Sequence, residues 1–355
     1  MVKSGIPGRT STATRGIPPA MSALVCHEDG KLVVEQMPVP EPGPGDALLR
    51  ISHCGICGTD LHFASGRIPH GTIVLGHEYS GVVVAVGGDV TGWAPGDRVV
   101  GGPGLGCGAC ARCLAGTPHL CPTGEHWGGA GNGSWAAFRR VDAGRLFRVP
   151  DSLDLRAAAL AEPVAIAVRA IRRGGAGAGD RVLVTGVGSI GLMAVALLVD
   201  LGAEVVVREP SANRRARALR IGAGQALEPG SPPSTDEPFA AVIECSGRPE
   251  VMEQAAPSLE RGGTLVLVGL GSGARPALDA TRLTLWEGTV TGSLDYSRAE
   301  FADAIALLAS GRLPVTDLLE PDDVPLDGVA DVLPRLARGE LAGKVLVAPG
   351  TTSDL

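Results

Sequence analysis

A glycine-rich segment in the second half of the chain restricts the fold more than any other feature of the sequence. Gly186, Gly188 and Gly191 form the spacing G-x-G-x-x-G between the apolar runs RVLVT and LMAVALLV. Glycines at these positions permit a tight turn, and the helix that follows presents unpaired amides and a partial positive charge. A strand, this turn and a helix in that order predict a site for the pyrophosphate of a dinucleotide, with Ser189 and Ile190 opening the helix.

Strand-like and helix-like segments alternate around this turn, from about residue 164 to residue 294. The strand patterns are RVLVTG, EVVVRE, AAVIECSG and TLVLVGL, and apolar helix patterns separate them. Such alternation predicts a doubly wound parallel sheet of the Rossmann type, and hence an α/β protein.

The earlier part of the chain has a different texture. Residues 21 to about 155 contain short β segments between Gly and Pro turns, for example DALLRISH, SGVVVAVG and DRVVGG. This pattern is typical of an irregular antiparallel sheet or a partly closed barrel. After residue 295 the segment AEFADAIALLASG and the strand KVLVAPG look like a return to this part. At 355 residues we therefore expect two domains, one formed by 21–163 and 295–355 and one by 164–294.

Composition excludes several classes of protein. The formal net charge of -7 argues against a nucleic-acid binder. The longest apolar run, Leu192 to Val199, is too short to cross a membrane. Residues 1–20 lack the apolar stretch of a secretion signal, and their Gly, Pro, Ser and Thr predict a disordered tail rather than a strand or lid. We therefore expect a cytoplasmic protein with a neutral or weakly charged small-molecule ligand.

Four cysteines in a short glycine-rich stretch predict a structural zinc site. Cys107, Cys110, Cys113 and Cys121 have the spacing C-x2-C-x2-C-x7-C, which lets one loop wrap four thiolates around a tetrahedral ion. An ion held by four cysteines has no open position, so it would stabilise the loop and catalyse nothing. An iron–sulfur cluster is the alternative, and two disulfides would require an oxidising compartment.

A second group of metal-binding residue types lies upstream, in HCGICGTDLH and in GHE. A catalytic zinc needs three protein ligands and one open position, and these segments offer a thiol, imidazoles and carboxylates. Spacing alone leaves the assignment open. Cys54 and Cys57 could both be ligands or could form a redox pair, and His77 could be an ordinary core histidine.

The ordered set GICGTDLH, GHE, GDRV, the four-cysteine segment, AEP and the glycine turn resembles the zinc-dependent medium-chain dehydrogenases, from about residue 21 to residue 347. The resemblance implies a GroES-like first domain beside the Rossmann domain. It also implies a catalytic zinc bound by Cys57, His77 and Glu162. The carboxylate at Glu162 is similar to the polyol (sorbitol) dehydrogenase pattern, whereas simple alcohol dehydrogenases have cysteine there and threonine dehydrogenases aspartate.

Further roles follow from the resemblance alone. Asp60 would orient the ring of His77, and Glu78 would lie next to the metal and exchange with its water. Thr59 would take the proton of the substrate hydroxyl and pass it through the nicotinamide ribose to His62. Thr59 as a turn residue and His62 as a structural histidine are the alternatives.

The strand EVVVRE ends at Glu209, about twenty residues after the glycine turn. A carboxylate there accepts hydrogen bonds from the adenosine ribose and repels a 2'-phosphate, which favours NAD over NADP. Arg208, Arg214 and Arg215 are close enough in sequence to bind such a phosphate, although a solvated helix face is the simpler interpretation. Of these, Arg214 is our candidate for cofactor binding.

The predicted function is hydride transfer between NAD and a secondary alcohol such as a polyol, cyclitol, sugar or diol, with two zinc ions per chain. A threonine or amino-alcohol dehydrogenase is the alternative, and a non-catalytic zinc and nucleotide binder is a more remote one. The family resemblance implies a homodimer or homotetramer, with TLVLVGL and TVTGSL as candidate edge strands. Four residues are guesses for the lining of the substrate cleft: Phe63, Ile68, His70 and Trp127.

Overall fold

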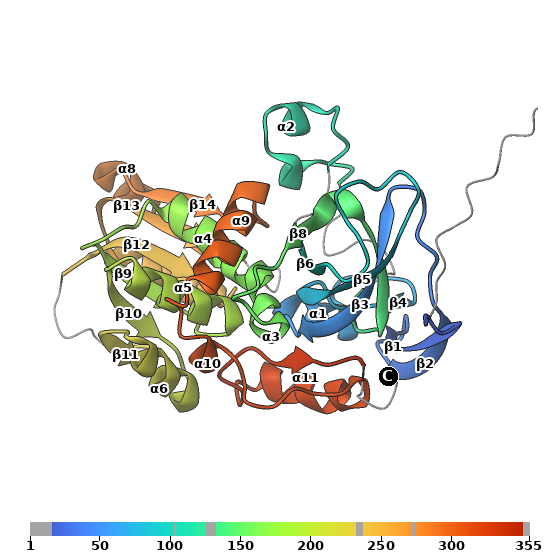
Figure 1. Cartoon of the computed structure of the whole chain (residues 1–355). Coiled ribbons are helices and arrows are strands. Elements are labelled where there is room, and N and C mark those ends of the chain that lie inside the picture. The colour runs from blue at the N-terminus through green and yellow to red at the C-terminus, as the bar shows by residue number, and fades with distance from the viewer. Residues whose placement is uncertain are drawn as a thin grey trace, which may run out of the picture.

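The computed structural model describes residues 16–102, 104, 106–124, 133–231, 237–271 and 275–350. Within these residues the strands form one antiparallel six-stranded sheet, one parallel six-stranded sheet and a small three-stranded sheet. The parallel sheet and the antiparallel sheet occupy opposite halves of the molecule (Figure 1). The chain is therefore an α/β protein with an irregular β-rich part and a Rossmann part, as the sequence predicts.

The antiparallel sheet is built around one long strand, β3 (Asp46–Gly55). It pairs with three others, β5 (Tyr79–Val86), β7 (Phe138–Asp142) and β15 (Leu346–Val347). The sheet continues from β5 to β6 (Arg98–Gly101) and β8 (Leu146–Arg148). A hairpin and a short strand make the separate sheet, β1 (Ala20–Cys26), β2 (Leu32–Pro38) and β4 (Ile73–Val74). The C-terminal strand thus closes onto the N-terminal part of the chain.

The parallel sheet has the strand order β11-β10-β9-β12-β13-β14. Its members are β9 (Arg181–Thr185), β10 (Glu204–Arg208), β11 (Gln225–Leu227), β12 (Phe239–Glu244), β13 (Leu259–Leu267) and β14 (Thr289–Gly292). The order runs one way from β9 to β11 and then reverses at β12, so β9 and β12 flank a topological switch point. In open sheets of this kind ligands bind outside the carboxyl ends of the strands at that point. The glycine turn follows β9, so it lies there.

Helices cover both parts of the structure. Around the parallel sheet they are α4 (Ala161–Gly174), α5 (Ser189–Asp200), α6 (Ala212–Ile221), α7 (Pro249–Ala255), α8 (Ala280–Trp286) and α9 (Arg298–Ala309). Shorter helices serve the β-rich part and the connections, namely α1 (Gly58–Ala64), α2 (Ala111–Leu114), α3 (Leu155–Ala158), α10 (Val315–Leu318) and α11 (Val329–Ala337). Single 3-10 turns cover Pro118–Leu120, Ala143–Arg145, Ala256–Ser258 and Leu326–Gly328.

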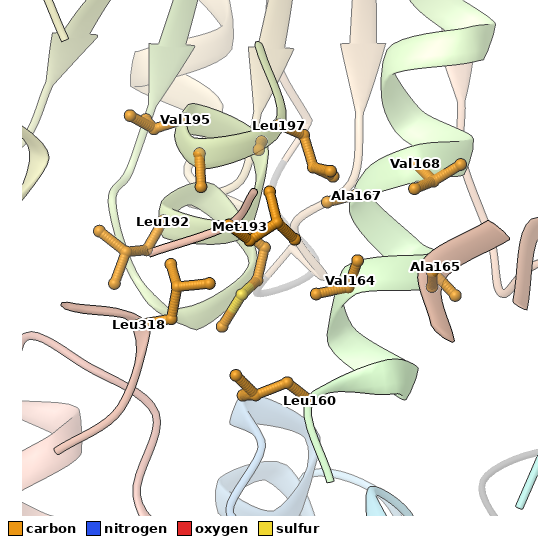
Figure 2. Close-up of a cluster of buried hydrophobic side chains, with 14 of the residues drawn as sticks. Leu160, Val164, Ala165, Ala167, Val168, Leu192, Met193, Val195, Leu197 and Leu318 are labelled. Carbon is orange, nitrogen blue, oxygen red and sulfur yellow. The ribbon is translucent and has the colours of Figure 1, made fainter. Parts of the chain in front are cut away.

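The largest apolar core lies between α4, α5 and the parallel sheet. Leu160, Val164, Leu192 and Met193 are fully buried and face one another across the two helices, with Leu318 closing one side (Figure 2). Helix α5 is buried through eight consecutive residues, from Gly191 to Leu198. An all-round apolar helix belongs in a core, which explains why the longest apolar run of the sequence is no membrane segment.

The two C-terminal segments that the sequence assigns to the first domain pack in different places. Strand β15 pairs with β3 and so joins the first part of the chain, as predicted. Helix α9 instead buries Phe301, Ala304 and Leu308 in the core shared with α4 and α5. Its amphipathic pattern gave the correct helix but could not show which sheet the apolar face would cover. The domain boundaries at 163/164 and 294/295 stay predictions.

The N-terminal tail falls almost entirely outside the described residues. Of the segment 1–20, only Gly16 to Ala20 are described, and Ala20 is already the first residue of β1. Among the described residues, no helix combines the length and the apolar character needed to cross a bilayer.

The core between α4 and α5 gives a stability prediction. Met193 is fully buried, so Met193→Ala should lower the free energy of unfolding by about 2–5 kcal/mol through lost burial and a cavity. Leu201 follows the same helix but is 44% exposed, and Leu201→Ala should change it by no more than about 0.5 kcal/mol. Urea unfolding of both variants checks this. Equal losses would contradict the placement of α5.

Candidate metal and cofactor site

The start of α1 fixes the position of Cys57. Cys57 is the N-cap residue, and its thiol accepts a hydrogen bond from the amide of Thr59 at 3.5 Å. Its own amide donates to Oδ2 of Asp60 at 2.8 Å, which completes a capping box. Two reciprocal bonds of this kind define both the helix start and the direction of the capping side chain. The motif CGTD therefore holds a thiol at a fixed place.

The turn between β4 and β5 carries His77 and Glu78. Gly76 precedes them with a φ of 94°, and a Cβ there would lie 2.7 Å from Cδ1 of Trp135 and 2.8 Å from Sγ of Cys54. Only glycine fits this conformation and this space. The packing of the turn against Trp135 and Cys54 thus fixes the backbone that carries the histidine and the carboxylate.

Cys57, His77 and Glu78 come together at one point. One ligand atom from each of them lies within 4.8 Å of the other two. Glu78 is fully buried, and its Oε1 accepts a hydrogen bond from Nζ of Lys344 at 2.6 Å. Its Oε2 is buried without a hydrogen-bond partner among the described residues. A thiol, an imidazole and a carboxylate oxygen with no protein donor are a donor set that fits a zinc ion.

The pKa shifts in and around this group are those expected of a site that fits a bound cation. Burial and the nearby Glu78 carboxylate raise the pKa of the Cys57 thiol to about 12, although Lys344 acts in the opposite direction. Burial also raises the pKa of Glu162 well above its usual range, with His77 opposing the shift. A bound divalent cation would favour the thiolate of Cys57 and the carboxylate of Glu162, and so would oppose both of these pKa shifts.

Two members of this group, Cys57 and His77, lie at the wall of a cavity of about 150 Å3. Cys57, His77 and Glu162 line this cavity together with Thr59, and Ile190 from the first turn of α5 lines it as well. The other lining residues are Gly102, Gly104, Arg145, Ile166, Val268, Leu270, Ser293, Leu294, Asp295 and Tyr296. One pocket therefore contacts the metal-binding group of the β-rich part and the glycine turn's helix in the Rossmann part.

The four cysteines of the second metal motif also converge. The ligand atoms of Cys107, Cys110, Cys113 and Cys121 all lie within 4.8 Å of one another, and none of the four is in a disulfide. Loop amides donate to the sulfurs, for example the amide of Cys107 to Cys121 at 3.4 Å and that of Cys110 to Cys107 at 3.3 Å. Such bonds lower the pKa of Cys121 to about 6 and also that of Cys107. This loop is suited to hold a tetrahedral ion with no open position.

The glycine turn has the geometry that its sequence predicts. Gly186 has a φ of 78°, and a Cβ on Gly191 would lie 2.0 Å from the carbonyl oxygen of Gly186. Gly188 is the N-cap of α5, and no side chain caps the helix there. The amides at the start of the helix, from Ser189 and Ile190 onward, therefore remain available to an anion.

Glu209 follows β10 and is 3% exposed. Its carboxylate accepts a hydrogen bond from the amide of Val187 at 2.7 Å and another from the amide of Ser211 at 2.9 Å. Glu209 therefore braces the glycine turn from the neighbouring strand. A carboxylate oxygen accepts more than one hydrogen bond, so a ribose hydroxyl remains compatible with these contacts.

Comparison with known proteins agrees with this geometry. Residues 43–151 match the alcohol dehydrogenase GroES-like domain, and residues 189–310 match the zinc-binding dehydrogenase domain. The chain is 34% identical over 337 residues to the sorbitol dehydrogenase of Gallus gallus, covering 90% of this chain and 94% of that protein. This chain belongs to the zinc-binding alcohol dehydrogenase family.

Solved structures of such dehydrogenases have the same fold. A zinc-binding dehydrogenase from Sinorhizobium meliloti bound to NADP has a TM-score of 0.85 and 31% identity, covering 93% of this chain and 99% of its own. An alcohol dehydrogenase from Escherichia coli CFT073 complexed with NADH has a TM-score of 0.87 and 25% identity, covering 94% and 100%. The dehydrogenase described here is thus an oxidoreductase, and its relatives include both NAD and NADP complexes.

The structure brings two of the three predicted zinc ligands together and places the third, Glu162, in the same pocket. Cys57 and His77 are brought together, but the carboxylate in the compact group is Glu78 rather than Glu162. Glu162 lies in the first turn of α4 and lines the same pocket. The capping of α1 and the turn after β4 bring adjacent loops together, whereas Glu162 arrives on a separate helix. The role of Glu162 as the third ligand stays a prediction.

The structure shows where Asp60, Thr59 and His62 lie relative to His77 and the pocket. Oδ1 of Asp60 lies 3.9 Å from Nδ1 of His77, too long for a hydrogen bond, and its other oxygen caps α1. Burial raises the pKa of Asp60 to about 6, and the proximity of His77 opposes this shift. Thr59 lines the pocket, while His62 is outside its lining. The relay from Thr59 to His62 stays a prediction.

The arginines near Glu209 have structural partners. Arg214 donates to the carbonyl oxygens of Leu341 at 2.9 Å and Leu336 at 3.4 Å, so α6 is tied to the C-terminal segment. Arg215 donates to the Glu209 carbonyl and pairs with the carboxylate of Glu228. These contacts do not favour the predicted cofactor role of Arg214, because its guanidinium is directed to backbone carbonyls on another element.

The four residues suggested for the substrate cleft are not found in the described lining of this pocket, and their role stays a prediction. Phe63, Ile68 and His70 are absent from the described lining of the pocket, and Trp127 lies outside the described residues. His70 packs edge-on against Phe63 and bonds its carbonyl oxygen at 3.0 Å. Nearness in sequence to the metal motif was therefore a poor guide to the pocket.

Sequence reasoning missed several residues that the fold brings to the site. Asp295 and Tyr296 reach the pocket from the loop after β14, and Arg145 reaches it from the turn before β8. Lys344 comes from the last segment of the chain. None of them belongs to a motif, although the φ of 54° at Asp295 is unusual for a residue other than glycine. Only the topology could place them.

The raised pKa of Glu162 gives a test on the metal-free protein. The folded state keeps the Glu162 proton to a higher pH than the unfolded chain does. Metal-free stability should therefore fall as pH rises above the ordinary carboxyl pKa, and Glu162→Gln should reduce that fall. Melting temperatures of the metal-free variants between about pH 5 and pH 8 check this.

The matched control is Glu250→Gln, because the Glu250 side chain is 60% exposed. Its melting temperature should follow the parent at every pH. The interpretation fails if the melting temperature of Glu162→Gln minus that of the parent stays constant or decreases as pH rises.

Proposed function

We propose that this dehydrogenase uses a zinc ion held by Cys57, His77 and Glu78 to oxidise a secondary alcohol of a polyol, with NAD as hydride acceptor. The observation that carries the proposal is the shared pocket, which is lined by Cys57 and His77 and also by Ile190 from the first turn of α5. Hydride transfer needs the alcohol carbon and the nicotinamide side by side, and domain interfaces at switch points provide such sites.

The polyol class is supported by the polar side chains of the pocket. Glu162, Ser293, Asp295 and Tyr296 line it and can accept or donate hydrogen bonds to several hydroxyls. The similarity to sorbitol dehydrogenase, whose name gives a polyol substrate, points the same way. A simple monohydric alcohol has a single hydroxyl and would engage fewer of these polar groups, which discriminates against it.

Each residue of the pocket has a separate role in the proposed oxidation of the alcohol. A zinc ion in this site would lower the pKa of the substrate hydroxyl as a Lewis acid. Thr59 lines the pocket and would accept the hydroxyl proton on its way to His62. Glu162 is left to hydrogen-bond the substrate or a water. Ile190 and Val268 exclude bulk water from the pocket wall.

The cofactor would be held by the glycine turn, with its pyrophosphate on the amides at the start of α5 and its adenosine ribose on Glu209. The negative charge of Glu209 disfavours a 2'-phosphate, which supports NAD over NADP. We propose a second zinc ion in the loop of Cys107, Cys110, Cys113 and Cys121. That ion would stabilise the loop without taking part in the reaction.

An amino alcohol is the second candidate substrate. Glu162 and Asp295 provide carboxylates in the pocket, and Arg145 provides a guanidinium. These groups would pair the ammonium and the carboxylate of a hydroxy amino acid such as threonine.

We also keep a homodimer or homotetramer and a cytoplasmic location as predictions. Of the two strands that the sequence offered as edges, β13 is internal, between β12 and β14, and β14 is an edge of the parallel sheet. Strand β14 therefore remains the candidate for pairing between subunits.

An NADH-formation screen tests the proposed function. Polyols, cyclitols and sugar alcohols should reduce NAD faster than ethanol or threonine, and Cys57→Ala should abolish the reaction and release one zinc per chain. A preference for threonine would favour the second candidate. Full activity in Cys57→Ala, or no activity on any alcohol by zinc-loaded protein, would contradict the proposal.

Cofactor choice is tested at Glu209. Glu209→Gln keeps an oxygen to accept from Val187 or Ser211 but removes the charge. We expect the ratio of kcat/KM for NAD over NADP to fall by roughly tenfold, which corresponds to about 1.4 kcal/mol. Steady-state kinetics with both cofactors measure the ratio. An unchanged ratio, or a parent enzyme that prefers NADP, would show that Glu209 does not select the cofactor.

A further inference from the structure

Lys344 is an unusual residue in this chain. The sequence contains three lysines, Lys3, Lys31 and Lys344, against a combined total of 31 lysines and arginines. Lys344 is 1% exposed, and burial of a lysine is costly unless its charge is paired. A compact ammonium has therefore been placed in the interior of a protein that otherwise uses arginine almost throughout.

The ammonium of Lys344 has two acceptors. Nζ donates to Oε1 of Glu78 at 2.6 Å and to the carbonyl oxygen of Ile56 at 3.1 Å. Ile56 is the residue before Cys57, so Lys344 contacts both segments that carry the metal-binding group. The bond to Glu78 occupies one carboxylate oxygen, and the other has no partner among the described residues.

The backbone around Lys344 is fixed on both sides. The amide of Lys344 donates to Leu318 at 2.8 Å, and its carbonyl accepts from Glu320 at 2.9 Å. Strand β15 begins two residues later and pairs Leu346 with Gly55. The ammonium is therefore presented from a braced segment rather than from a free chain end.

Gly55 closes the other side of the Glu78 carboxylate. A Cβ on Gly55 would lie 1.9 Å from Oε2 of Glu78 and 3.0 Å from its Cδ. The carboxylate thus lies between the bare backbone of Gly55 and the ammonium of Lys344. Its rotation is restricted by packing on one face and by a charged hydrogen bond at one oxygen.

We propose that Lys344 is a positioning residue of the metal centre, which holds Oε1 of Glu78 so that the carboxylate offers a single oxygen to the ion. This inference rests on the proposed function, because it takes Glu78 as a ligand. A carboxylate free at both oxygens can bind through both. One-oxygen binding, with Cys57 and His77, leaves the open position that an alcohol substrate needs.

Charge compensation alone would be a different role for Lys344. In that case any loss of its charge would disturb the site, whether or not a hydrogen-bond donor remained. The positioning role depends on the donor. Lys344→Met and Lys344→Gln separate the two, because both replacements are uncharged and of similar length, and only glutamine donates a hydrogen bond.

The experiment exchanges cobalt(II) into the catalytic site while the four-cysteine loop keeps zinc, and metal analysis verifies one cobalt and one zinc per chain. Visible absorption of cobalt(II) is strong in four-coordinate sites and weakens as coordination number rises. In Lys344→Met the cobalt ion should bind both oxygens of Glu78, so the protein should lose most of this absorption. Turnover should fall roughly tenfold or more. Lys344→Gln should keep the parent spectrum.

Each outcome decides the proposal. Equal spectra in Lys344→Met and the parent, or equal loss in both variants, would overturn it. If Lys344→Met does not fold, the parent-like spectrum of Lys344→Gln supports the donor role and a weakened one contradicts it. Absence of metal or activity in the parent itself would instead remove the proposed function, so the two failures are distinguishable.

Discussion

Burial of acidic groups around one thiol is the constraint on which the site depends. Cys57, Glu78 and Glu162 lie in a region where burial raises the pKa of Cys57 and Glu162, and the one lysine there cannot neutralise them all. A divalent cation would supply the remaining positive charge. The fold delivers these groups on rigid turns and on the start of a helix. The arrangement therefore favours an ion over an empty polar core, which would be unstable.

The parts of the fold that depend on local pattern were predictable. Apolar runs separated by a glycine turn and by helical periodicity gave the order of β9, α5 and β10, because each element is defined by its own residues. Metal-binding motifs with short spacing were also predictable, because the residues within one segment determine how they come together. The four cysteines converge because fifteen residues of one loop contain them all. Cys57 and His77 were recognised from an ordered set of motifs, which is stronger than either alone.

The parts that depend on packing between distant segments were not predictable. Helix α9 packs against α4, while β15 pairs with β3, and nothing in their sequences distinguishes these destinations. Lys344 reaches Glu78 across 266 positions of the chain. Glu162 reaches the pocket on α4 rather than on the loops that carry Cys57 and Glu78, and a motif does not encode which carboxylate binds the ion. Residues without a motif, such as Asp295, become visible only when the pocket is assembled.

The most direct test of the account is the position of zinc in crystals grown with NAD, located by anomalous scattering at the zinc absorption edge. The account predicts two peaks per chain. One would be bonded to Cys57, His77 and a single oxygen of Glu78, beside the nicotinamide, and the other to the four cysteines. A catalytic peak bound by other side chains, or its absence from the pocket in active protein, would contradict the central claim.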